Sequence, residues 1–151
     1  MERGSFDLSD ALEMNRFILY LNLTGNAIGN EGISYILPAI AKSNTVRSLN
    51  LTSNDITSGP IRQLIQKEKQ RQGLSSKYVD LQMFPSLAPF KHGRSIDEDK
   101  KDKNRYRLQS AHLIKDFLEK SSSVKEFSLK QNKIGDEGMA IIAQALDNFQ
   151  C

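Results

Sequence analysis

The 151-residue sequence has no tryptophan, a single cysteine and only two histidines. Because the one thiol is Cys151, no intrachain disulfide can form, and a zinc site built from several cysteines or histidines is not expected. A phosphate-binding loop of the G-x-x-x-x-G-K-[ST] type is also missing. We therefore expect neither a metal nor any other cofactor.

Long apolar runs are missing too. No window approaches the ~18 apolar residues that a membrane-spanning helix needs, and the opening "MERGSFDLSDALEMN" lacks the apolar core of a signal peptide. The net charge of +3 is small, and residues 91–107 alone carry that excess. We expect a single cytoplasmic domain that binds neither membrane nor nucleic acid.

What the sequence does contain is a threefold repetition. "LNLTGNAIGNEG" (21–32) returns as "LNLTSNDITSGP" (49–60), 28 positions later, and again as "FSLKQNKIGDEG" (127–138). The shared template is L-x-x-L-x-L-x-x-N-x-I, followed by an amphipathic segment. A fixed period of this length is typical of a stack of similar strand–helix units.

The leucines of the template alternate with polar residues, as in a half-buried strand. Leu21 and Leu23 are expected to point inward, while Tyr20, Asn22 and Thr24 point outward. An asparagine follows each predicted strand where the chain must bend. Its amide can bond the exposed backbone groups of the bend, so stacked units are expected to form an amide ladder of Asn26, Asn54 and Asn132.

A helix is predicted after each bend. Asn30 and Asp136 are the expected N-caps, and helical spacing places Ile142 and Leu146 in the core. His112 falls in a predicted helix, where its role is structural or at the surface. No catalytic constellation is visible, so the chain is not expected to be an enzyme.

The template divides the chain into one domain, 1–151, of about four and a half units. In "YVDLQMFPS", the template predicts a further strand through Tyr78, Leu81 and Met83, with Ser86 at the asparagine position. The predicted units are a partial one at 1–17, then 18–45, 46–77, 78–123 with a charged insertion at about 91–108, and 124–151, which ends without a cap.

These motifs resemble the leucine-rich repeats of the ribonuclease-inhibitor type, which have a 28-residue period and an asparagine at the bend. The resemblance implies an α/β fold, a curved solenoid with parallel strands on its concave face and helices on its convex face. Members of that class include ribonuclease inhibitor, the Ran GTPase-activating protein, tropomodulin-like actin cappers, NOD-like receptor sensors, and subunits of ciliary and cytoskeletal complexes. Nearly all act by binding proteins.

The function expected from this resemblance is a non-enzymatic adaptor or scaffold. We expect it to bind an unidentified protein partner as a subunit of a hetero-complex, or as a fragment of a longer array, in a cytoplasmic assembly of cytoskeletal or axonemal type. Two alternatives stay open: a small-GTPase regulator, and a fragment of an innate-immune sensor.

Two candidate binding regions follow from the template. The outward strand positions are expected to form a protein-binding concave face, although a solvated sheet face that binds nothing is the alternative; they are Tyr20, Asn22, Thr24, Ser48, Asn50, Thr52, Asp80, Gln82, Phe84, Glu126, Ser128 and Lys130. The insertion is either a tolerated surface loop or a charged arm that orders on an acidic partner, through Lys100, Lys101, Lys103, Arg105 and Arg107.

Overall fold

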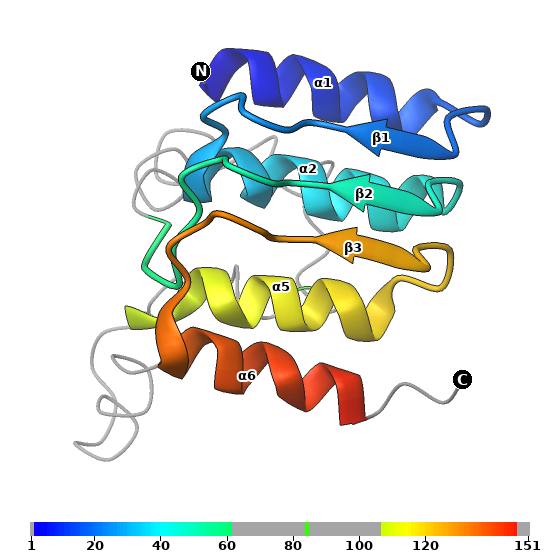
Figure 1. Cartoon of the computed structure of the whole chain (residues 1–151). Helices are drawn as coiled ribbons and strands as arrows, with labels where there is room; N and C mark the ends of the chain where they lie inside the picture. Colours follow the sequence, from blue (N-terminus) through cyan, green and yellow to red (C-terminus); the bar gives the residue numbers. More distant parts are fainter. Residues whose placement is uncertain (1, 62–83, 85–106, 148–151) are drawn as a thin grey trace, which may run out of the picture.

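The computed structural model describes residues 2–61, 84 and 107–147 (Figure 1). Helices and strands alternate along this part of the chain, in the order α1 (Glu2–Met14), β1 (Tyr20–Asn22), α2 (Gly29–Ser43), β2 (Ser48–Asn50), α5 (Gln109–Lys120), β3 (Glu126–Ser128) and α6 (Gly135–Asp147).

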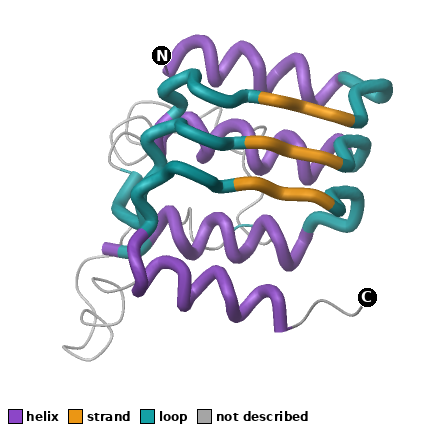
Figure 2. The backbone as a smooth tube through the Cα atoms, viewed as in Figure 1, coloured by secondary structure: helices purple, strands orange, loops and turns teal. Residues whose placement is uncertain are grey.

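The three strands form one parallel sheet in the order β1-β2-β3. Leu21 pairs with Leu49, and Leu49 pairs with Phe127, so equivalent positions of the repeat lie side by side. The helices form a second layer along the sheet, with α1 and α6 at opposite ends of the stack (Figure 2). Parallel strands joined by helices, in the register that the repeat predicts, confirm the two-layer α/β architecture.

The predicted asparagine ladder is confirmed. The backbone N–H of Asn26 donates to Oδ1 of Asn54 at 2.9 Å, and the N–H of Asn54 donates to Oδ1 of Asn132 at 2.9 Å. Nδ2 of Asn54 donates back to the carbonyl of Leu23 at 2.9 Å. Asn54 and Asn132 thus each link their own bend to the preceding one. Asn54, between the other two, is 0% exposed.

The bend itself repeats. Gly25, Ser53 and Gln131 stand at equivalent positions just before the asparagine, and all three adopt positive φ, at 71°, 55° and 56°. Glycine adopts this left-handed region without strain, whereas serine and glutamine do so at some cost. The bend geometry is therefore imposed by the stacking and the ladder rather than by glycine.

The core fills the space between sheet and helices. Leu49, Leu51 and Ile56 of the second unit are at most 1% exposed, and Leu12 of α1 packs into the same cluster. The ring centroids of Phe117 and Phe127 lie 5.7 Å apart. A helix, α1, therefore occupies most of the segment predicted as a partial first unit, and its Leu12 is buried.

One predicted strand has no place in the stack. Backbone bonds join β2 directly to β3, from Leu51 N to Ser128 O at 2.9 Å and from Ser53 N to Lys130 O at 3.0 Å. The predicted placing of a strand from 78–86 between them is therefore wrong, and those residues, Phe84 excepted, lie outside the described part of the chain. Asn26 and Asn54 are 28 positions apart, whereas Asn54 and Asn132 are 78 positions apart. The second interval therefore contains 50 more residues than the first, and they fall between β2 and α5.

Two expectations about the helices are also wrong. Asn30 lies inside the first turn of α2 and is not its N-cap; its side chain instead bonds the next unit, with Oδ1 accepting from Thr57 N at 2.9 Å. Asp136 likewise follows the first residue of α6. Leu146 was assigned to the core but is 56% exposed, because no described element packs on that side of α6.

Candidate protein-binding face

The strand face is the side of the sheet that the helices leave uncovered. Residues alternate along a strand, so while Leu21, Leu49 and Phe127 turn toward the helices, their neighbours turn away. The described residues that turn away form what we call the strand-face row: Tyr20, Asn22, Thr24, Ser48, Asn50, Thr52, Glu126, Ser128 and Lys130.

Tyr20 is the most prominent member of this row. It lies in register with Ser48, which in turn lies beside Glu126, and it is 75% exposed. Phe17, shortly before β1, is 88% exposed, and Met14, at the end of α1, is 83% exposed. Large exposed aromatic and methionine side chains are enriched in protein interfaces, and tyrosine is common among the residues that dominate binding.

The small polar members of the row are held by local hydrogen bonds. Oδ1 of Asn22 accepts from the backbone N–H of Thr24 at 3.1 Å and from its hydroxyl at 2.6 Å. Asn50 repeats the backbone bond with Thr52 at 3.0 Å. The Nδ2 groups of both asparagines have no partner among the described residues, so the turn fixes each amide and leaves its donor available to a ligand.

The row changes character from one edge of the sheet to the other. β1 presents an aromatic ring, and β2 presents small hydroxyl and amide groups. The third strand presents Glu126, and Lys130 follows two residues after its end; both are exposed. The hydroxyls of Thr52 and Ser128 lie 3.1 Å apart and join the last two strands. The row is therefore a pre-formed and chemically varied surface, which suits the recognition of another protein.

Not every predicted site residue belongs to this surface. Phe84 was expected to point outward, but it is 1% exposed and belongs to the hydrophobic core, so its assignment to the binding face is wrong. Arg107 of the predicted charged arm forms an ion pair with Glu137 at 2.8 Å, with 58% of its side chain exposed. Lying outside the described residues are Asp80, Gln82, Lys100, Lys101, Lys103 and Arg105.

Sequence reasoning missed Met14 and Phe17. Both fall between the template positions Leu12 and Ile18, so the repeat gives them no structural role. An apolar residue at a position that the template leaves free is the signal that could have identified them.

The described residues contain no group of three or more His, Cys, Asp or Glu side chains that could hold a metal ion. Within the same ranges, no helix has both the length and the apolar character to cross a membrane.

Comparison with known proteins agrees with the geometry. The model of the family described as "Leucine Rich repeat" matches residues 15–37, 42–59 and 120–143, which contain β1, β2 and β3. No curated protein matches the chain. Leucine-rich repeats generally mediate protein–protein interaction, and no catalytic family is indicated. The alternating fold, the asparagine ladder and this match together establish that the chain is a leucine-rich repeat protein.

Proposed function

We propose that the chain is a non-enzymatic adaptor that binds a protein partner through the strand-face row. The observation that carries the proposal is the exposure of Tyr20, at 75%, beside a row of amides and hydroxyls that local bonds hold in place. A side chain as large as tyrosine gains much from burial in a partner. Pre-formed polar neighbours lower the entropy cost of that binding.

We further propose that the chain acts as a scaffold within a larger hetero-complex. We also propose that its repeats belong to the ribonuclease-inhibitor-type class of the family. The 28-residue step between Asn26 and Asn54 supports that class. A contact made on the strand face leaves the helix layer free for further subunits (Figure 2).

Site-specific photo-crosslinking tests the proposed face. A benzophenone amino acid is placed at Tyr20 in one variant and at Met139 in another, and both are expressed in cells that make the natural partner. Met139 is the matched control because it is also apolar and exposed, at 48%, but lies on α6 in the helix layer.

We expect the Tyr20 variant to give a discrete crosslinked protein, identified by mass spectrometry, and the Met139 variant to give none of that species. Tyr20→Ala should weaken binding of the identified protein by about tenfold, which corresponds to ~1.4 kcal/mol. Crosslinking at Met139 but not at Tyr20 would move the interface to the helices and refute the proposal.

A further inference from the structure

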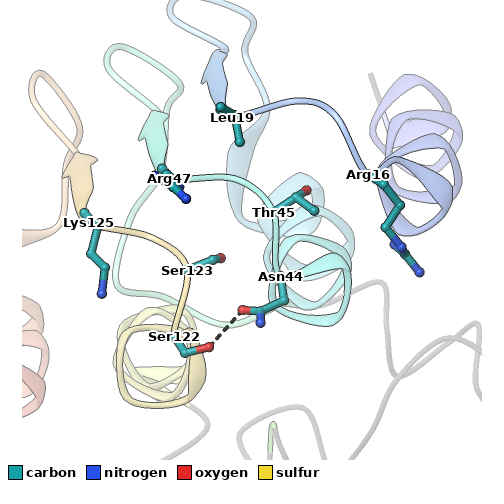
Figure 3. Close-up of a pocket in the computed structure, with 8 residues that line it drawn as sticks. All are labelled: Arg16, Leu19, Asn44, Thr45, Arg47, Ser122, Ser123 and Lys125. Atoms are coloured by element: carbon teal, nitrogen blue, oxygen red, sulfur yellow. Dashed lines mark hydrogen bonds between the residues drawn. The ribbon is translucent and has the colours of Figure 1, made fainter.

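A pocket lies at the edge of the stack where the helices end and the strands begin (Figure 3). Its volume is about 510 Å³, and it spans three successive units of the repeat. Three of its lining residues are basic and none is acidic. We call it the basic pocket; its lining residues are Arg16, Leu19, Asn44, Thr45, Arg47, Ser122, Ser123 and Lys125.

Two of the basic residues are neighbours in the sheet. Arg47 and Lys125 directly precede β2 and β3, and the N–H of Lys125 donates to the carbonyl of Arg47 at 2.7 Å. Adjacent strands lie ~4.8 Å apart, and both side chains extend to the same side of the backbone in Figure 3. Like charges in adjacent strand positions repel each other, so placing this pair side by side destabilises the folded chain when no ligand is bound.

No ion pair within the described part of the chain offsets these two charges. Two acids near the ends of neighbouring helices bond other lysines: Glu13 bonds Lys42 at 3.1 Å, and Glu119 bonds Lys115 at 3.1 Å. Arg47 and Lys125 are both exposed and form no ion pair within the described part of the chain. Their charges therefore remain available to an anion from outside.

The rest of the pocket adds polar donors and one apolar surface. Oδ1 of Asn44 accepts from the hydroxyl of Ser122 at 2.9 Å, which fixes the amide and leaves its Nδ2 free among the described residues. The guanidinium of Arg16 donates to the carbonyl of Glu13 at 3.0 Å and is thereby held at the edge of the pocket. Leu19, 40% exposed, supplies an apolar contact.

We propose that the basic pocket binds an acidic segment of a partner polypeptide, with one carboxylate accepting hydrogen bonds from both Arg47 and Lys125. A carboxylate has two oxygens and can bridge two cations at this spacing. A peptide, unlike a phosphate, can also use the apolar surface of Leu19 and the amide of Asn44. The small net charge of +3 does not favour nucleic acid, whose binding depends on neutralising many phosphates.

Fluorescence anisotropy with a short labelled oligoglutamate peptide tests this inference on the whole chain. Arg47→Glu together with Lys125→Glu should weaken peptide binding by about tenfold or more, since two attractions become repulsions. The charge-preserving exchange Arg47→Lys with Lys125→Arg should bind within about twofold of the parent chain, because each position keeps a cation.

The matched control reverses two lysines that belong to neither the pocket nor the strand-face row, Lys115→Glu with Lys133→Glu. This variant has the same net charge as the pocket variant, so it should retain binding within about twofold if the pocket is specific. A loss confined to this control would place the acidic ligand outside the basic pocket and refute the inference, while leaving the proposed strand-face contact untouched.

Three other outcomes would overturn the inference. They are equal loss in both double reversals, tighter binding of a single-stranded oligonucleotide than of oligoglutamate, and displacement of the peptide by inorganic phosphate at equal concentration. Arg47→Gln with Lys125→Gln removes the charges without introducing new ones and should weaken binding by about threefold. If the glutamate variant unfolds, as monitored by circular dichroism, this variant decides the result.

Discussion

Replacing Asn54 by alanine should destabilise the fold far more than the same change at Asn26. Oδ1 of Asn54 accepts from the backbone N–H groups of Asn26 at 2.9 Å and Ile28 at 3.4 Å. Its Nδ2 donates to the carbonyls of Leu23 at 2.9 Å and Thr52 at 3.2 Å. Alanine removes all four bonds from a side chain that is 0% exposed.

The magnitude follows from the groups that lose their partners. A buried polar group left unpaired costs about 1–3 kcal/mol. The two bonds at 2.9 Å are the strong ones, so we expect Asn54→Ala to lower the free energy of unfolding by about 3 kcal/mol. Asn26 is exposed and its Nδ2 bonds only carbonyls of its own bend. Water can replace those bonds, so Asn26→Ala should cost about 1 kcal/mol or less.

Urea unfolding followed by circular dichroism measures both values on the same chain. Asn54→Asp is a useful third variant, because it keeps the acceptor for Asn26 but loses the Nδ2 donor and buries a charge. It should also be strongly destabilised. If the two alanine variants lose equal stability, or if Asn54→Ala loses less than about 1 kcal/mol, the hydrogen bonds of the ladder do not hold adjacent units together.

Two further predictions concern the free energy of unfolding. A Cβ added at Gly138 would lie 2.7 Å from a side-chain atom of Ser58, so Gly138→Ala should lower that free energy by about 1–3 kcal/mol. The control is Gly4→Ala in α1, where an added Cβ meets nothing within 4 Å; it should be neutral or stabilising by up to ~1 kcal/mol. Equal effects at the two glycines would contradict the close packing at Gly138. Phe84→Ala should lower the free energy of unfolding by about 3–5 kcal/mol in thermal or chemical unfolding, whereas Tyr20→Ala should change it by at most about 0.5 kcal/mol. A negligible effect of Phe84→Ala would mean that its ring is not buried in the core.

The fold was largely predictable because each template position has a structural reason. Alternating leucines predicted the strands, and the 28-residue offset predicted the register, in which Leu21 pairs with Leu49. The asparagine ladder followed from the need to satisfy backbone groups at the bend. These inferences concern contacts between adjacent units, and the repeat in the sequence shows which residues occupy equivalent positions in those units.

The predicted strand at 78–86 shows where the same method fails. Three apolar residues at suitable spacing, Tyr78, Leu81 and Met83, matched the template, but Ser86 stood where the ladder needs an asparagine. A serine hydroxyl lacks the two N–H donors with which Asn132 reaches the carbonyl of Leu51 in the preceding unit and that of Leu129 in its own. Giving more weight to this hydrogen-bonding position than to the apolar pattern would have rejected that strand, and with it the outward assignment of Phe84.

At the end of a stack, whether a side chain is buried depends on the unit beside it and not on the type of residue. Leu146 fills its template position and is 56% exposed, because a helix face in this fold is covered by the next unit along. The side chains of Ile36 and Ile40 on α2, by contrast, are 0% exposed because units lie on both sides. The sequence shows which template position a residue such as Leu146 fills, but it does not show whether another helix packs beside that residue.

The basic pocket shows why the functional surface was harder to predict than the fold. Arg47 and Lys125 lie in one column of equivalent positions, directly after the position of Val46 and Val124. In the sequence they are 78 positions apart, and the strand predicted between β2 and β3 separated them further. Only the direct pairing of β2 with β3 brings the two charges together. In a repeat protein, the residues at one free template position in successive units lie side by side on the surface and must be compared together. This comparison pairs the right residues only when the number of strands between them is known.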